Sequence, residues 1–380
     1  MRRVLASAVA VLLLTLASGC AAPLESTDQP SNGDPGAIAQ RLTRALAGDD
    51  SASFQAAFAD ADAAQFLAVR LWRNLSQFTD PAITAHDGTL SVTWRVPGDA
   101  RPAVDVLSAR WADSPEGERQ LASLAPMSDQ RVPLWFSDDL TVVAAQGCTL
   151  IVPAASPRDL SRTCANAATR VSDAGLAILS PTWTRTLVVE IPATNADFAS
   201  LTGTDPADNV GVGGLTHHEG VDPVPGPARA VLNPATAWSA PLDQVESLLA
   251  HEGVHHALAD RTPALPLWVS EGLADHVALP ASPGWKADVA QRLVAAYTGG
   301  SQPHPLRMPT DADFAGDAVT DHADLQLAYD TAWLMVDTLL SERGSEEGLA
   351  DLGRLASGDS SVTSTQWLTW AHERIESLAR

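Results

Sequence analysis

The feature that most constrains this chain is a pair of histidines one helical turn apart, in the segment His-Glu-Gly-Val-His at 251–255. If the segment is helical, His251 and His255 lie on one face and both imidazoles can reach a single cation. Glu252, directly after the first histidine, points toward the same region and can take a proton from a water bound to that cation. The segment therefore predicts a metal site on a helix, with a base beside it.

The residues around the motif predict that helix. Apolar side chains recur through the segment at roughly helical spacing, at Val245, Leu248, Leu249, Val254 and Leu258. Residues that favour a helix start come first and a proline ends the run: Ser239, Pro241, Asp243 and then Pro263. Gly253 within the helix costs about 1 kcal/mol relative to alanine, which indicates close approach of another backbone.

A third metal ligand is expected downstream, because a catalytic zinc ion usually takes three protein ligands and keeps a fourth position for water. The candidates on the next predicted helix are Glu271, Asp275 and His276. We predict Glu271, because a short loop between antiparallel helices returns its carboxylate to the level of the histidines. Asp275, one turn further on, can then orient a ligating imidazole, with His251 the expected partner. His256 points about 100° away on the helix and is predicted to pack or face solvent.

The motif His251-Glu252-x-x-His255, followed by Trp-x-x-Glu-Gly-x-Ala at 268–274, resembles the gluzincin branch of zinc metallopeptidases, in the peptidase MA-like superfamily. The resemblance implies a Zn²⁺ cofactor held by His251, His255 and Glu271. It implies Glu252 as general base and acid, and Asp275 as a carboxylate that supports a ligand.

The resemblance extends more loosely over about residues 145–355. It implies an edge strand at Ala228–Pro234 that aligns the substrate backbone, and an oxyanion-stabilising role for Tyr329. Tyr329 also lies on or beside an apolar helical stripe, so a half-buried core tyrosine is the alternative. The stripe consists of Leu325, Ala328, Ala332, Trp333, Val336 and Leu340. His322 is a second candidate for the oxyanion role.

The first residues predict export. Met1-Arg-Arg is followed by an apolar run from Val4 to Leu16, too short to span a bilayer, and by small residues before Cys20. This pattern resembles a bacterial lipoprotein signal at 1–19, with lipid attached to Cys20; an ordinary secretory signal is the alternative. Residues 20–36 are predicted to be a flexible tether. We expect an extracytoplasmic protein anchored to the cell membrane by lipid.

The cysteines and the net charge limit the compartment and the partners expected for this protein. Cys148 and Cys164 are expected to pair in an oxidising compartment, which closes a loop worth roughly 3 kcal/mol. The net charge of −22 argues against a nucleic-acid partner. It favours basic substrates, with solubility at the cell surface as the alternative reason.

The rest of the chain divides into two predicted domains, at 37–140 and 141–380. The first has helical patterning near Ile38–Leu46 and from Phe54 to Leu75. Strand-like segments between turn signals then follow: Thr89–Val96, Val104–Trp111 and Val132–Phe136. Helices before a curved antiparallel sheet resemble the cone-shaped domain typified by nuclear transport factor two.

The second domain is predicted to be zincin-like, a small sheet followed by helices that carry the motif, so the fold class is α+β. The expected elements are strands at Leu150–Val152 and Leu187–Ile191, a helix near 157–176, a short helix at Asp197–Leu201, and later helices near 285–298 and 325–342. His217-His218-Glu219 is expected in a solvated glycine-rich loop, with a substrate contact or a second metal as the alternative.

Two functions from different classes fit these observations. The first is an exported, membrane-anchored zinc metallopeptidase that hydrolyses a peptide or protein substrate. The second is a non-catalytic surface lipoprotein that uses a zincin scaffold for binding or envelope assembly. Both bind zinc, so hydrolysis and not metal content separates them.

Overall fold

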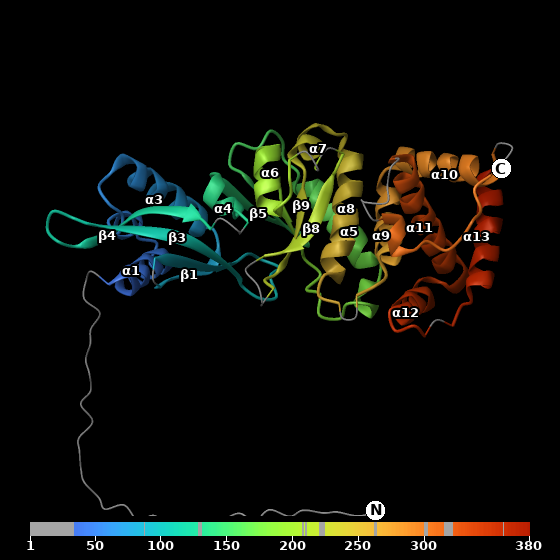
Figure 1. Cartoon of the computed structure of the whole chain (residues 1–380), viewed down its shortest axis with the longest axis horizontal. Helices are drawn as coiled ribbons and strands as arrows, with labels where there is room; N and C mark the ends of the chain where they lie inside the picture. The colour runs from blue at the N-terminus through green and yellow to red at the C-terminus, as the bar shows by residue number, and fades with distance from the viewer. Residues whose placement is uncertain are drawn as a thin grey trace, which may run out of the picture.

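The computed structural model describes residues 34–380, apart from 87, 128–130, 207, 208, 210, 220–224, 262, 263, 300–302, 315–321 and 360. The described chain is elongated, and three parts follow one another along its longest axis (Figure 1). A four-stranded sheet with helices lies at one end, a five-stranded sheet lies in the middle, and a group of helices lies at the other end. The fold thus combines helices with two separate sheets. The predicted signal segment, Cys20 and most of the tether lie outside the described residues.

The N-terminal part packs helices against one face of an antiparallel sheet. Its elements are α1 (Pro35–Ala47), α2 (Ser51–Gln55), α3 (Asp62–Leu75), β1 (Thr79–His86), β2 (Thr89–Arg95), β3 (Ala103–Asp113) and β4 (Arg119–Pro126). The strands pair in sequence order, and residues of β2 alternate between buried and half-buried positions, as expected for a sheet covered on one side. α1 begins within the predicted tether, where Asp34 caps it.

Two predictions in this part are wrong. The helix expected from Phe54 to Leu75 is interrupted between α2 and α3, where Phe58 forms a bridge with Leu121 of β4. The strand expected at Val132–Phe136 is instead a short helix, α4 (Leu134–Ser137), that follows Pro133. The indole N–H of Trp135 in α4 donates to Asp105, so a tertiary contact fixes this segment.

The middle part is a mixed sheet with the strand order β5-β6-β7-β9-β8. Its elements are β5 (Leu140–Ala145), β6 (Cys148–Pro153), α5 (Ser161–Asp173), β7 (Leu187–Glu190), α6 (Asn195–Thr202), β8 (Gly214–His218), β9 (Ala228–Leu232) and α7 (Pro234–Ser239). β6, β7 and β9 run parallel, and the outer strands are antiparallel to them. The predicted disulfide Cys148–Cys164 is confirmed and joins β6 to α5.

The edge of this sheet differs from the expectation. Ala228–Pro234 was expected to be the edge strand, but β9 lies inside the sheet and every residue of it is buried. On this side of the sheet the edge strand is β8, which includes His217 and His218, so the expected solvated loop at these positions is wrong. Strand β9 is a continuous apolar run apart from Arg229, the pattern of a strand covered on both faces.

The helical part begins with the two helices that carry the motif residues. Its main elements are α8 (Leu242–Leu258), α9 (Leu267–Ala278), α10 (Pro283–Thr298), α11 (His322–Arg343), α12 (Ser345–Leu355) and α13 (Ser364–Leu378). α8 packs against α5 and α9, and α9 packs against α11. A Cβ on Gly253 would meet the side chain of Val171 at 2.8 Å, so the group that approaches this glycine closely is a side chain and not the expected backbone. No helix within the described residues is long and apolar enough to cross a membrane.

Two apolar cores run through the molecule. One lies between the five-stranded sheet and the helices. The other lies between the helices and the sheet of the N-terminal part and continues to the second sheet, where it joins Trp94 and Leu107 to Ile151, Val188 and Val231. The second core therefore continues across the predicted boundary at 140 and 141, and the two-domain division stays a prediction.

Candidate metal centre

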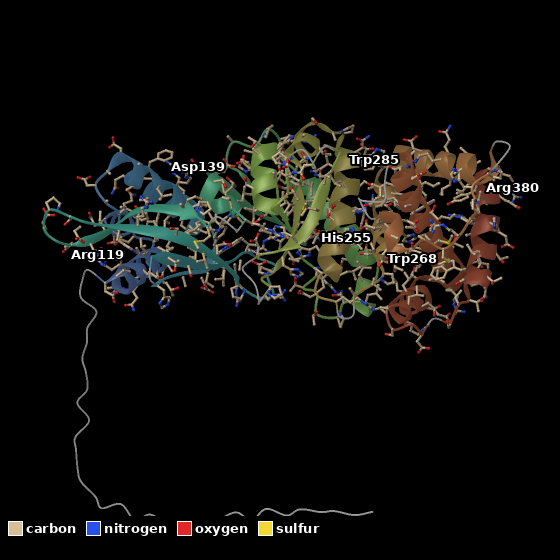
Figure 2. The ribbon with its side chains drawn as sticks, viewed as in Figure 1. Arg119, Asp139, His255, Trp268, Trp285 and Arg380 are labelled. Carbon is tan, nitrogen blue, oxygen red and sulfur yellow. A yellow bond between two sulfur atoms is a disulfide. The ribbon has the colours of Figure 1, made fainter. Side chains whose placement is uncertain are left out.

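Three side chains from two helices converge beside the five-stranded sheet. His251 and His255 project from α8, and their Nε2 atoms are 3.2 Å apart. Oε2 of Glu271, on α9, lies 3.3 Å from each of these nitrogens. Figure 2 shows His255 on α8 near the middle of the molecule. The structure thus brings together the three residues that the sequence indicates as ligands.

The spacing of these three atoms fits one small metal ion. Ligands at about 2.0–2.1 Å from a tetrahedral zinc ion are about 3.3 Å from one another. The separations of 3.2, 3.3 and 3.3 Å match that value. The donor set of two imidazoles and a carboxylate is one of those that catalytic zinc sites use, with a fourth position left for water.

The second nitrogen of each histidine is held by another side chain. Oδ1 of Asp275 lies 2.9 Å from Nδ1 of His251. Because a carboxylate only accepts, Nδ1 carries the proton and Nε2 presents its lone pair toward Glu271. Oγ of Ser270 lies 3.1 Å from Nδ1 of His255. Both rings are therefore oriented with Nε2 toward the third ligand atom on Glu271. Hydrogen-bond partners commonly orient metal-binding histidines in this way.

The charges around the three ligand atoms favour a cation there. Burial lowers the pKa of His251, but Asp275 and Glu271 outweigh it and raise that pKa well above its usual value. Burial raises the pKa of Glu271, whereas hydrogen bonds with His251 and His255 hold it down at about 2. The carboxylates thus stabilise positive charge between themselves and the imidazoles.

Glu252 is buried beneath the edge strand β8, next to the two histidines. Thr216 of β8 donates from Oγ1 to the carboxylate of Glu252 at 3.1 Å. Burial raises the pKa of Glu252, and the charges of His251 and His255 oppose this. A Cβ on Gly214 would lie 3.0 Å from Cγ of Glu252, so a glycine here leaves room for the glutamate.

A cleft of about 590 Å³ opens in front of these groups. Its walls are β8, the motif face of α8, the start of α9, and Tyr329 from α11. Tyr329 is half-buried with its ring edge-on to Phe314, and burial and the nearby carboxylates raise its pKa. His322 is the first residue of α11, but its side chain lies outside what the structure describes.

The other histidines considered as ligands lie elsewhere. His256 is buried on another side of α8, where burial and Arg229 lower its pKa to about 3. Nδ1 of His276 lies 3.1 Å from Asp337, away from the convergent group. Ser270 and Thr216 are not predicted from the sequence. Ser270 directly precedes Glu271 and could have been considered, but nothing near Thr216 links it to the motif helix.

Comparison with solved structures finds a two-domain M1 zinc metallopeptidase mutant in two complexes. The complex with L-arginine has a TM-score of 0.35 and 16% identity, and the match covers 80% of this chain and 64% of that chain. The complex with L-tryptophan has a TM-score of 0.32 and 15% identity, with 80% and 65% covered. This chain thus spans less than two thirds of the length of those chains. No protein-family model and no curated protein matches it. At these TM-scores the likeness establishes nothing about activity.

Proposed function

We propose that this protein is an exported, membrane-anchored zinc metallopeptidase. The observation that carries the proposal is the spacing of three ligand atoms, 3.2–3.3 Å apart, on His251, His255 and Glu271. Glu252 lies beside them at the wall of an open cleft. A structural metal would need a closed set of ligands, whereas three ligands beside a cleft and a base are typical of a catalytic site.

The chemistry divides between the metal and the protein. A bound zinc ion would supply a Lewis acid and lower the pKa of a water at the open position. Glu252 is placed to take a proton from the attacking water and to return it to the leaving amine. Thr216 holds the carboxylate of Glu252 in place by its hydrogen bond at 3.1 Å. Asp275 and Ser270 keep the two imidazoles aimed at the site.

The wall of the cleft supplies a place for a peptide. Strand β8 pairs with β9 on one side and is the outer strand of the sheet, so its other side offers backbone donors and acceptors to an extended segment. This role, expected from the sequence for Ala228–Pro234, therefore passes to β8. Tyr329 lines the same cleft and is the candidate donor to the developing oxyanion.

Hydrolysis of a peptide library by wild type and Glu252→Gln tests the proposal. The variant should keep its zinc and its fold, and hydrolysis should fall by about 10²–10⁴-fold or more. Glu246→Gln is the matched control, because Glu246 lies on the same helix but pairs with Arg170 at 2.7 Å. The control should cut as wild type does, and chelator should abolish cleavage by both.

If wild type and Glu252→Gln behave alike against the library and against envelope proteins, peptidase activity is contradicted. The function that then remains is that of a non-catalytic lipoprotein that binds or assembles. The ligand assignment has its own test. His251→Ala should lose zinc and His256→Ala should retain it, as measured by metal content. If Glu271→Ala binds zinc as tightly as wild type, the third ligand is wrong.

Export and anchoring rest on the first 20 residues of the sequence. A positive start, an apolar run and small residues before Cys20 support lipid attachment there. In a bacterial host, Cys20→Ala should move the protein from the membrane fraction to the soluble fraction. If the variant fractionates as wild type does, lipid on Cys20 is not the anchor.

A further inference from the structure

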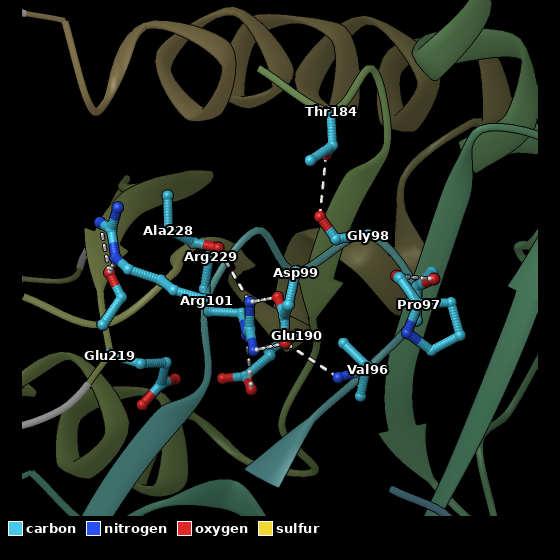
Figure 3. Close-up of polar contacts among 12 residues, drawn as sticks. Val96, Pro97, Gly98, Asp99, Arg101, Thr184, Glu190, Glu219, Ala228 and Arg229 are labelled. Carbon is cyan, nitrogen blue, oxygen red and sulfur yellow. Dashed lines mark hydrogen bonds and ion pairs between the residues drawn. The ribbon is translucent and has the colours of Figure 1, made fainter. Parts of the chain in front are cut away.

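A second group of buried polar side chains lies on the opposite face of the five-stranded sheet from α8. This face carries Glu190 of β7, Arg229 of β9 and His217 of β8. His217 pairs with Arg229, and Glu190 pairs with Val231, which lies two residues after Arg229 and so on the same face of β9. Glu219 follows directly after β8. These side chains lie between the two sheets, where Figure 3 shows Glu190 and Glu219 near Arg229.

Carboxylates outnumber cations in this buried region. Asp99 and Asp105 approach from the N-terminal sheet, and Glu190 and Glu219 from the second sheet; all four are buried. Arg229, which is fully buried, is the cation among them. One further guanidinium, from Arg131, reaches the group from outside, where it contacts Nδ1 of His217 and donates to the carbonyl of His218 at 3.0 Å.

The partners of the aspartates are accounted for. Arg229 binds Asp99 through both Nη atoms, at 2.5 and 2.9 Å. Asp105 accepts from the indole N–H groups of Trp94 and Trp135, each at 2.7 Å. Nε of Arg229 lies 3.7 Å from Oε1 of Glu190, and the charge of Arg131 also acts on the carboxylate of Glu219.

Three buried atoms in the group have no hydrogen-bond partner among the described residues: Oε2 of Glu190, Nε2 of His217 and Nε of Arg229. The side chain of His217 is only 5% exposed, and its Nε2 faces Oε1 of Glu219 at 3.9 Å. One ligand atom from each of Glu190, His217 and Glu219 lies within 4.8 Å of the others. Burying a polar atom without a partner is unfavourable, so unpartnered atoms on Glu190 and His217, within one cluster of possible ligands, indicate an occupant.

We propose that Glu190, His217 and Glu219 bind a second divalent metal ion between the two sheets, and that this ion is zinc. An imidazole and two carboxylates are ligands that zinc accepts, and two positive charges offset the excess of buried carboxylates. Binding through Nε2 leaves the ring proton on Nδ1, so the Arg131 guanidinium moves off Nδ1 and keeps its bond to the carbonyl of His218. The metal would join β8 to β7 through the face that carries His217, while Thr216 on the opposite face of β8 holds Glu252.

The competing occupant is a proton shared between the glutamates. Burial raises the pKa of Glu190 to about 7, with Arg229 opposing, and burial raises the pKa of Glu219 well above its usual value. A proton held there would satisfy one carboxylate and leave Nε2 of His217 without a partner. Metal stoichiometry separates the two occupants, and it does so whether or not the protein is a peptidase.

The experiment measures zinc in the variant His251→Ala/His255→Ala, which lacks the first site. After stripping with chelator and reloading with Zn²⁺, this variant should hold one equivalent by elemental analysis, and wild type should hold two. Adding His217→Ala should reduce the variant to none. His218→Ala is the matched control, because its ring lies on the other face of β8 and binds Asp260 at 3.0 Å; it should leave the equivalent in place.

A shape-conserving change protects the test against misfolding. Glu219→Gln in the same background should weaken zinc binding at least tenfold and abolish the rise in unfolding temperature that Zn²⁺ gives its parent. If the folded His251→Ala/His255→Ala protein holds no zinc and Zn²⁺ does not raise its unfolding temperature, the second site is refuted and the shared proton is the occupant. Retention of the equivalent by both His217→Ala and Glu219→Gln would also overturn the proposal.

Discussion

Replacing Gly272 by alanine should loosen the contact between the two helices that frame the cleft. Gly272 directly follows Glu271 on α9, where α9 packs against α11. A Cβ there would lie 2.6 Å from the carbonyl carbon of Ala332, closer still to its oxygen, and 2.8 Å from Cγ2 of Val336. Carbon atoms in ordinary contact are about 3.5–4.0 Å apart, so α11 must move by on the order of 1 Å.

The magnitude follows from two opposing effects. Alanine in place of glycine favours a helix by about 1 kcal/mol. Forcing a methyl group into a packed contact typically costs about 1–3 kcal/mol and occasionally more. The contact here is with backbone, which cannot rotate away, so the cost lies at the upper end. We expect Gly272→Ala to lower the free energy of unfolding by about 1–3 kcal/mol. Tyr329, one turn before Ala332, moves with α11, and a shift of about 1 Å can lower kcat by about 10²-fold.

Urea unfolding at equilibrium measures the change, with kcat and zinc content measured on the same protein. Gly284→Ala in α10 is the matched control, because a Cβ there meets nothing within 4 Å. The control should be unchanged or more stable by up to about 1 kcal/mol. If Gly272→Ala unfolds at the same urea concentration as wild type or higher, with the same slope, the close contact between α9 and α11 does not exist in solution.

Three further predictions concern single side chains. Asp275→Asn should weaken zinc binding by about 10–100-fold in a chelator competition, because the amide no longer fixes the proton on Nδ1 of His251; an unchanged affinity would exclude that role. Tyr329→Phe should lower kcat by about 10²–10³-fold with zinc content unchanged, whereas a core tyrosine would instead show up as lost stability. Arg229→Met should lower the free energy of unfolding by about 3–5 kcal/mol, since it leaves Asp99 buried without its cation; a wild-type urea midpoint would contradict this.

The motif helix could be predicted because its evidence is local. The apolar spacing around His251 and His255 predicts a helix, and a helix alone brings two histidines four apart to one face. The same holds for α9, where Glu271 and Asp275 are one turn apart. The loop between the helices is short, so their approach follows from chain connectivity. The sequence predicts Asp275 as the partner of His251. It does not predict the partner of the His255 ring, because Ser270 is an ordinary surface residue type until its neighbour is known.

The position of β9 inside the sheet, where an edge strand was expected, has a signal in the sequence. Ala228–Leu232 is apolar except for Arg229, which is the pattern of a strand covered on both faces. β8 carries few residues of high strand propensity, and its sequence predicts a loop because glycine and two histidines do not favour a strand. Pairing with β9 makes this segment a strand, so its secondary structure is determined by tertiary contacts.

The buried group between the sheets lies beyond sequence reasoning for a further reason. Its members come from segments far apart in the chain, with Asp99 before β3, Glu190 in β7, and His217 in β8. Each of these residue types is ordinarily exposed, so no pattern marks any of them as buried. Contact between the N-terminal part and the second sheet removes them from water together.

That contact also bears on what the N-terminal part does for the cleft. A chain that began at residue 141 would expose Val188 and Val231 and would leave Arg229 without Asp99. It would also lose Arg101, which binds Asp260 just beyond the end of α8 at 2.7 and 3.0 Å. β8 would then keep Thr216 against Glu252 but lose the support of its other face. We therefore infer that the N-terminal part supports the edge of the cleft.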